Sequence, residues 1–546
     1  MRVLLVHSKF PATYWGFQYS LPIIGKRATL PPLGLCTLAA LLPTQWSLRL
    51  VDLNVGTLTD AELRWADVVF VGGMLVQADS MREVVARARA LGRPTVVGGP
   101  APTTSPHLFP EADALFLGEA EGRVDELVTA VEELRKPRRR LTPMTLARPE
   151  HEARPQLSHS AVPRYDLLDV ASYRTLSVQY SRGCPFTCEF CDVIEIFGRV
   201  PRVKSDEQVL AELDAIYRLG HRGPVFFVDD NFIGNKKAVR KLLPVLREWQ
   251  HAHGNPFQFY TEASVNLAAD EPLVRDMVAA GFNSVFIGIE TASVEALRET
   301  RKKQNVGVDL TAAVESLTRA GLEVMGGFIV GFDSDGPEAF EAQRAFIASV
   351  PIPLAMVGML IALPGTQLEK RLTREDRLRF VSSGDQFSRT NFEPKMGDQA
   401  LLEGYIRLLD ELYSLDAYEA RCARFLELIG PPAKTAPTTL VDLEIVARAA
   451  VRLGVLGERR ALFWRLLARA ARGGLPSIRW AITHAVQGEH MIRYTHEVVL
   501  PRLRRAASRP SRGSVGASTS SSAASRATPS VVGALLHAGG ERLSTV

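Results

Sequence analysis

Three of the five cysteines stand close together near the middle of the chain. Cys184, Cys188 and Cys191 follow a C-x3-C-x2-C spacing, whereas Cys36 and Cys422 are isolated. Three thiolates on one short loop can bind three irons of a cubane cluster, because soft sulfur ligands suit iron–sulfur sites, and the fourth iron then stays open to an external ligand. Spacing alone leaves two alternatives open. One is zinc, although structural zinc usually takes four ligands, and the other is buried thiols without a metal.

The composition is that of a globular protein with several domains. The chain has 546 residues, of which 46% are hydrophobic and 23% charged. A net charge of +5, without a recognisable DNA-binding motif, argues against a nucleic-acid partner. Few, unpaired cysteines indicate a reducing compartment. The first residues lack the features of a signal peptide, and no apolar run of about 18 residues predicts a transmembrane helix. We therefore expect a cytoplasmic protein.

Residues 1–135 alternate short apolar runs with helical segments, which favours a doubly wound, Rossmann-like parallel sheet. The predicted strands are Arg2–Val6, Leu48–Leu53, Asp67–Gly72, Thr95–Gly99 and Ala114–Gly118. The predicted helices are Leu33–Leu42, Ser80–Leu91 and Gly122–Leu134. Ligands of such sheets bind at the carboxyl ends of the strands. The basic, proline-bearing stretch that follows predicts an interdomain linker over residues 136–170.

A second alternating series spans residues 171–366. Its predicted strands are Leu176–Tyr180, Val225–Val228, Phe257–Tyr260, Val285–Ile289, Val324–Val330 and Met356–Ala362. Its predicted helices are Asp206–Leu219, Lys236–Trp249, Pro272–Ala280, Leu310–Ala320 and Pro337–Ala348. Six β/α units of this size predict a (β/α)6 barrel or partial barrel, and periodicity alone leaves an open sheet as an alternative.

The C-terminal part of the chain changes character. Residues 367–505 show helical periodicity with many charges, which predicts a mainly helical region, and the Ser/Ala/Arg-rich tail, residues 506–546, is predicted to be disordered. Within the helical region, Leu462–Val486 mixes Trp, Phe and Leu with Arg. We favour a soluble helical pair here. An interfacial amphipathic helix, with peripheral membrane contact, is the alternative.

In this setting the cysteine spacing resembles the radical S-adenosylmethionine (SAM) superfamily, whose members bind SAM at the open iron of a 4Fe-4S cluster. The cysteines directly follow the first predicted barrel strand, an aromatic residue precedes the last of them, and FFVDDNF, FIGIET, GGFIVGF and LPGT follow in order. The resemblance implies that Cys184, Cys188 and Cys191 are the cluster ligands. It implies SAM contacts from Phe190, Asp229, Asp230, Glu290, Gly326 and Gly327.

Each of the polar SAM contacts has an alternative. Asp229 and Asp230 could instead cap the helix that follows them. Glu290 could be a solvated loop residue, and the two glycines could mark a β-bulge.

The N-terminal domain resembles the cobalamin-binding domains that precede some radical SAM barrels. The resemblance rests on LPPLGLCTLAALLP, VDLN, VGGMLVQADS, VVGGPAPTTSP and GEAEG. It implies cobalamin contacts from Gly72, Gly73, Gln77, Gly98, Gly99, Pro100 and Glu119. The DxHxxG motif that supplies a cobalt-binding histidine is missing, because His7 lacks its Asp and Gly partners. We therefore expect cobalamin in a His-off state. A domain that binds no cobalamin and only supports the barrel is the alternative.

Over roughly residues 2–497 the chain resembles the subgroup that contains the hopanoid 2-methylases. The resemblance implies a C-methyltransferase in which one SAM methylates cobalamin and a second SAM yields a 5'-deoxyadenosyl radical that removes hydrogen from an unactivated carbon. It implies a lipid or other small-molecule substrate and an electron donor such as flavodoxin or ferredoxin. Two further interpretations are a non-methylating radical SAM cyclase or rearrangement enzyme, and a non-catalytic cobalamin or redox sensor.

Overall fold

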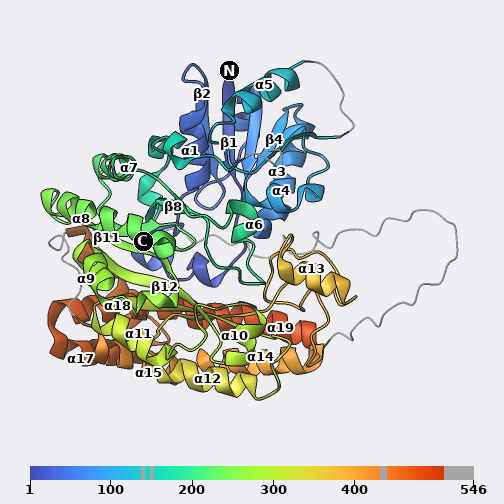
Figure 1. Cartoon of the computed structure of the whole chain (residues 1–546). Helices are drawn as coiled ribbons and strands as arrows, with labels where there is room; N and C mark the ends of the chain where they lie inside the picture. The colour runs from blue at the N-terminus through green and yellow to red at the C-terminus, as the bar shows by residue number, and fades with distance from the viewer. Residues whose placement is uncertain (137–141, 148–152, 431–439, 509–546) are drawn as a thin grey trace, which may run out of the picture. The chain divides into compact units, whose positions relative to one another are not determined.

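The computed structural model describes residues 1–136, 142–147, 153–430 and 440–508. Parts of the predicted linker, residues 137–141 and 148–152, lie outside the described residues, as does the predicted disordered tail from residue 509 onward. Residues 1–508 form one compact unit, shown in Figure 1.

The first sheet is entirely parallel and confirms the predicted α/β architecture. Its six strands run in the order β2-β1-β3-β4-β5-β6. Their bounds are β1 Arg2–His7, β2 Ser47–Asp52, β3 Val68–Gly72, β4 Thr95–Gly98, β5 Ala114–Leu117 and β6 Met144–Ala147. The main helices between them are α1 Leu33–Leu41, α2 Asp60–Trp65, α3 Ala78–Ala90, α4 Pro100–Thr104 and α5 Val124–Leu134. Buried apolar side chains on both faces of the central strands explain their nearly continuous apolar runs.

Strand β6 corrects the predicted linker, since it lies inside residues 136–170 and pairs in parallel with β5. An edge strand is bonded on one side only and is half-exposed, so its four residues alternate in burial and form no apolar run. The short helix α2 was also missed. Six residues are too few for a helical period, and a Thr59–Glu62 capping box fixes its start.

The second sheet is also parallel, with strand order β14-β13-β12-β11-β10-β7. Its strands are β7 Leu176–Val178, β10 Gly223–Phe227, β11 Phe257–Ala263, β12 Phe282–Glu290, β13 Glu323–Val330 and β14 Ala355–Met359. The helices include α7 Asp206–Arg218, α8 Lys236–Ala252, α9 Glu271–Ala279, α10 Val294–Glu299, α11 Leu310–Arg319 and α12 Ala339–Ser349. The two edge strands do not pair with each other. The six units therefore form the predicted partial barrel.

A mainly helical C-terminal region packs against the edge of this barrel, as predicted. Its helices are α13 Gln367–Arg374, α14 Asp398–Leu412, α15 Leu415–Leu428, α16 Leu440–Ala449, α17 Arg460–Ala470, α18 Gly474–Arg493 and α19 Leu500–Ala507. The Tyr405 hydroxyl donates to the Val357 carbonyl at 2.7 Å, and Tyr413 donates to Ala355. Both bonds fix the helices to the edge strand β14. None of the described helices has the length and apolar character needed to cross a bilayer.

Candidate active site

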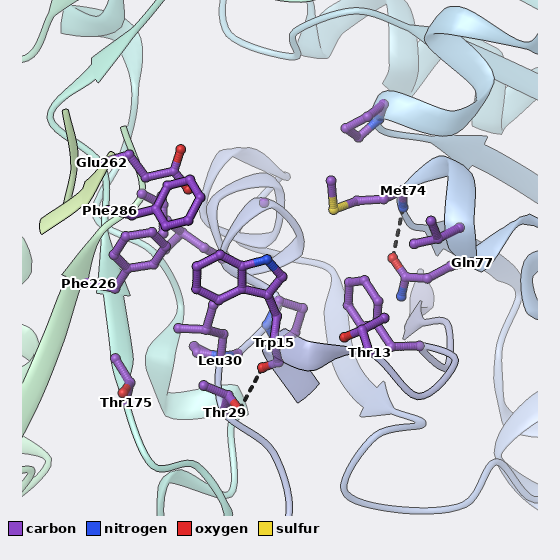
Figure 2. A pocket seen from close by; sticks show the side chains of 18 of the residues that line it. Thr13, Trp15, Thr29, Leu30, Met74, Gln77, Thr175, Phe226, Glu262 and Phe286 are labelled. Atoms are coloured by element: carbon purple, nitrogen blue, oxygen red, sulfur yellow. Dashed lines mark hydrogen bonds between the residues drawn. The ribbon is translucent and has the colours of Figure 1, made fainter. Parts of the chain in front are cut away.

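A single large cavity is lined by side chains from both sheets. Its volume is about 1940 Å³, whereas a site for one drug-sized ligand usually measures about 300–1,000 Å³. The lining includes the loops after β3, β4 and β5 and the inward-facing residues of the barrel strands. Figure 2 shows part of it, with Gln77 and Met74 on one side and Glu262, Phe226 and Phe286 on the other. The cavity therefore has room for more than one bound group.

The predicted cobalamin residues converge on this cavity. Gly72, Gly73, Gln77, Gly98, Gly99, Pro100 and Glu119 all line it. Gly99 has φ +98°, and a Cβ there would lie 3.2 Å from the Gly73 carbonyl oxygen, so two adjacent loops touch through glycine backbone. At Gly118, an added Cβ would meet nothing within 4 Å. At Gly118 the wall of the cavity is therefore open backbone, whereas the Leu35 side chain lies against Gly72 and the Met81 side chain against Gly73. Glycine-rich loops of this kind fit a flat, bulky macrocycle.

Two polar residues of that set already have protein partners. The Gln77 side chain accepts from the Met74 amide at 2.8 Å and donates to the Ser8 carbonyl. Glu119 forms ion pairs at 3.0 Å with Arg182 and with Arg202. Both side chains therefore hold the loops in place.

An ion-pair cluster connects the first sheet to the cysteine loop. Arg182 comes two residues before Cys184, and its guanidinium lies 3.0 Å from Glu119 and 2.8 Å from Glu121. Arg182 holds the pKa of Glu121 below its usual value, although burial acts in the opposite direction. Sequence patterns could not reveal this pairing, because the partners are more than 60 residues apart.

The cysteine loop runs between the short strands β8 (Ser181–Arg182) and β9 (Arg202–Val203) and contains α6 (Val193–Phe197). The Cys184 amide donates to the Gly198 carbonyl at 3.2 Å, and the Cys191 amide to the Cys188 carbonyl at 3.3 Å. All three cysteines are free thiols. Among the described residues, no three His, Cys, Asp or Glu side chains converge into a preformed metal cage. The loop therefore presents three separate thiols.

Two amides that the sequence analysis missed lie against the sulfurs. The Asn231 side chain donates to Cys184 Sγ at 3.8 Å, and the Gln304 side chain donates to Cys188 Sγ at 3.5 Å. Hydrogen bonds of this kind to cluster sulfurs tune iron–sulfur sites. Three soft thiols with amide donors fit an iron–sulfur cluster better than zinc, which usually takes a fourth ligand.

The two neighbouring aspartates differ in environment. Asp229 accepts from the Tyr180 amide at 2.8 Å, the Ser181 amide at 2.9 Å and the Ser181 hydroxyl at 2.8 Å. It therefore ties the strand before the cysteine loop to β10. Asp230 also lines the cavity, and its buried Oδ2 atom has no hydrogen-bond partner among the described residues. Burial raises the pKa of Asp230 to about 6 and that of Asp229 to about 7.

The alternative role of these aspartates, capping the next helix, is wrong. The N-cap of α8 is Asn235, whose side chain accepts from the Ala238 amide at 3.1 Å. A four-residue 3-10 turn, Phe232–Asn235, separates the aspartates from the helix, so neither carboxylate reaches its first turn.

Glu290 ends β12 with φ +65°, lines the cavity and forms an ion pair with Lys302. It is buried, so the solvated-loop interpretation is wrong. The Lys302 ammonium lies 5.9 Å from the centre of the Phe190 ring, which packs against Phe332. Phe190 lies within the cysteine loop, directly before Cys191, and does not line the cavity.

The two glycines of β13 that were predicted to contact SAM lie in different surroundings. Gly327 lines the cavity, whereas Gly326 does not. A Cβ at Gly326 would meet Phe328 at 2.7 Å and Ile352 at 3.2 Å. Alternate strand residues face opposite sides of a sheet, so Gly327 is the better placed of the two for a ligand in the cavity, and the prediction that Gly326 contacts SAM stays a prediction.

Aromatic residues that the sequence analysis did not single out line the barrel side. Phe226 and Tyr260 stack at 4.6 Å between ring centres, and Trp15 packs edge-on against Phe286 at 5.0 Å. Among them stands Glu262, which has no hydrogen bond or ion pair among the described residues (Figure 2). Burial, together with the nearby Asp230 and Asp229 carboxylates, raises the pKa of Glu262 to about 8.

Three segments of the chain match known families. Residues 26–128 match the B12 binding domain, residues 178–346 the radical SAM superfamily, and residues 366–501 a domain of unknown function.

Two bacterial proteins are similar over nearly the whole chain. An uncharacterized methyltransferase of Synechocystis sp. is 42% identical over 90% of this chain and 92% of its own length. The hopanoid C-2 methylase of Rhodopseudomonas palustris is 34% identical over 91% of this chain and 94% of its own length.

Solved structures share the fold. OxsB, a cobalamin-dependent radical SAM enzyme solved with aqua-cobalamin and SAM, superposes with a TM-score of 0.56 at 16% identity, over 94% of this chain and 82% of its own. The methyltransferase TsrM from Kitasatospora setae, solved with cobalamin and a [4Fe-4S] cluster, gives 0.53 at 17% identity, over 93% of this chain and 100% of its own. With the two matched domains and the full-length relatives, these findings show that the chain belongs to the family of cobalamin-binding radical SAM methyltransferases that includes the hopanoid C-2 methylase.

Proposed function

We propose that this enzyme transfers a methyl group to an unactivated carbon of a lipid or another apolar metabolite. The observation that carries the proposal is the shared cavity, in which the glycine loops of the first sheet face the barrel interior. A methyl donor on one side and a radical generator on the other can then both reach a substrate between them.

In this proposal Cys184, Cys188 and Cys191 hold the 4Fe-4S cluster, with Asn231 and Gln304 as donors to two of the sulfurs. When bound, the cluster and SAM supply a 5'-deoxyadenosyl radical, and cobalamin supplies the methyl group. The reducing electron would come from a partner such as flavodoxin or ferredoxin.

Asp230 is the stronger of the two aspartate candidates for the amino group of SAM. Asp230 lines the cavity, and its buried Oδ2 atom has no hydrogen-bond partner among the described residues, so it needs a donor. Asp229 has three donors already and acts as a positioning residue for the cysteine loop. Glu290 and Gly327 complete the proposed SAM contacts at the ends of β12 and β13.

The glycine-rich loops at Gly72, Gly73, Gly98 and Gly99 would carry cobalamin, with its cobalt lacking a histidine ligand. His7 is the nearby alternative, since it lines the cavity and is buried enough to lower its pKa. Electron paramagnetic resonance of the Co(II) form distinguishes the two. We expect no nitrogen hyperfine splitting in the wild type and an unchanged spectrum in H7A, whereas a splitting that H7A removes would show a His-on state.

The aromatic lining favours an apolar substrate. Phe226, Phe286 and Trp15 present apolar ring surface to the space in front of the barrel. A protonated Glu262 can donate one hydrogen bond there without placing a charge in an apolar site. The hopanoid C-2 methylase among the relatives supports a lipid.

Methyl-labelled SAM tests the proposal. Reconstituted enzyme should move the label into an organic-soluble product and form 5'-deoxyadenosine. A product without label would favour the non-methylating cyclase or rearrangement enzyme. No 5'-deoxyadenosine at all, from protein with a full cluster, would favour the sensor.

A further inference from the structure

We propose that the helices from α16 to α18 form a docking surface for a membrane of anionic phospholipid, and that a lipid substrate enters the cavity beside it. The docking surface consists of Leu443, Val446, Val451, Val455, Leu456, Trp464 and Leu475. The entrance rests on the proposed function, whereas the docking itself does not.

The docking surface gathers an unusual share of the exposed apolar side chains. Fifteen large hydrophobic residues of the described chain are exposed, and seven of them fall between Leu443 and Leu475. Leu456 and Leu475 are each 73% exposed. Single exposed apolar residues are ordinary, but a concentrated group on one structural unit marks an interaction site.

These residues belong to neighbouring elements. Trp464 on α17 donates its indole N–H to the Gly454 carbonyl at 2.8 Å, which places it against the π-helical turn η10 (Ala450–Val455) that carries Val451 and Val455. The polar edge of the indole is therefore satisfied within the protein. The rest of the ring, 53% exposed, presents an apolar face outward.

The charge around the docking surface favours an anionic partner. Between Leu443 and Arg479 the chain carries eight arginines against two glutamates. Glu419 and Glu489, from neighbouring helices, pair with three of these arginines, Arg459, Arg465 and Arg469, so the excess of positive charge is smaller but remains. Arg460 and Arg472 form no ion pair among the described residues. Apolar side chains between free arginines are the pattern of a helix that lies in the headgroup region of a bilayer.

The cavity reaches this surface. Ile445 on α16 and Leu475, Pro476 and Trp480 on α18 line it, and so do Leu21 and Ile24 of the turn η2 (Leu21–Ile24). Arg452 donates to the Pro22 carbonyl at 2.9 Å and fixes η10 against that turn. Because Leu475 is exposed and also lines the cavity, a lipid leaving the bilayer here has an apolar route inward.

The C-terminal tail fits this surface less well than a membrane does. From Arg509 onward it carries four arginines and one glutamate, so its charge has the same sign as that of the docking surface. Its residues 509–530 are also rich in Ser, which offers little apolar area for contact.

Flotation with vesicles tests the proposal on the full-length protein. We expect binding to phosphatidylcholine vesicles that contain about 30% of the anionic lipid phosphatidylglycerol. Binding to vesicles of phosphatidylcholine alone should be weak. L456S/W464S/L475S should weaken binding by at least about tenfold, and R460Q/R472Q by roughly 25-fold, at about fivefold per arginine. The matched control is F380S, which removes a comparably exposed aromatic residue outside the surface and should change binding by less than about twofold.

Three results would overturn the proposal: no binding to anionic vesicles at low salt, equal losses in the control and the triple variant, or a dimer in solution that only the triple variant dissociates. Circular dichroism confirms that each variant is folded. Label transfer to a substrate presented in detergent micelles is measured separately. A failure of docking with intact transfer refutes only this inference, and a failure of transfer with intact docking refutes only the proposed function.

Discussion

Replacement of Arg182 by methionine should destabilise the folded protein by about 3–5 kcal/mol, the usual cost of removing one member of a buried ion pair. The Arg182 side chain is 12% exposed, and that of its partner Glu121 is 3% exposed. Glu119 keeps Arg202 at 3.0 Å in the variant. Glu121 loses its ion-pair partner, and its buried carboxylate keeps only the weaker attraction of Lys204.

The loss of folding stability in R182M should depend on pH. In the wild type, Arg182 keeps the pKa of Glu121 low against the effect of burial. This contribution to stability is present above the unfolded pKa, about 4.3, and is lost as the pH falls through the folded pKa. In R182M, burial remains the largest influence on Glu121, and the opposing effects of Lys204 and a backbone amide are smaller. The pKa of Glu121 therefore rises in the folded variant, which takes up a proton at a higher pH than the folded wild type does. The difference in stability between the two proteins should therefore shrink between pH 7 and pH 5.

Urea unfolding of the protein without cofactors, followed by tryptophan fluorescence, measures both effects. E121Q and the double variant R182M/E121Q complete a double-mutant cycle, and the double variant should recover part of the loss. The control is R2M, which breaks the half-exposed Arg2–Asp67 pair at 2.9 Å and should cost about 1 kcal/mol or less. If R182M costs no more than R2M, or costs the same at both pH values, the reasoning is wrong.

Three further predictions concern the cofactors and the cavity. C184A should abolish the absorption of the reconstituted cluster and all SAM cleavage. C36A should leave both intact, because the Cys36 thiol is buried elsewhere, with its pKa raised to about 12. The reverse pattern would refute the ligand assignment. G99A should lower hydroxocobalamin affinity at least about tenfold, since its Cβ would meet the adjacent loop, whereas G92A, also at positive φ but facing open space, should retain binding in equilibrium dialysis. The melting temperature of E262Q should rise relative to that of the wild type as the pH increases from 5 to 8. The reason is that Glu262 keeps its proton up to about pH 8 in the folded wild type, whereas the unfolded chain releases it near pH 4.3. Curves of melting temperature against pH that run parallel for the two proteins would contradict this.

The sequence by itself determined the two parallel sheets and the cysteine loop. Continuous apolar runs such as Val68–Gly72 arise wherever a strand is buried on both faces. The cysteine spacing is likewise local, because three thiols within eight residues need only one loop. Elements with weak local signals were missed, and β6 is the example: its half-exposed edge position leaves no apolar run to detect.

The tertiary structure alone decided which polar groups are free to bind. Asp229 and Asp230 are neighbours in sequence, but Asp229 accepts hydrogen bonds from Tyr180 and Ser181, whereas the buried Oδ2 of Asp230 has no partner among the described residues. Arg182, next to the cysteine loop, pairs with Glu121, which follows the first sheet, and the Glu262 side chain has no partner among the described residues. Local periodicity fixes which face of an element is buried, whereas the pairing of side chains depends on how separate elements pack together, and no short stretch of sequence carries that information.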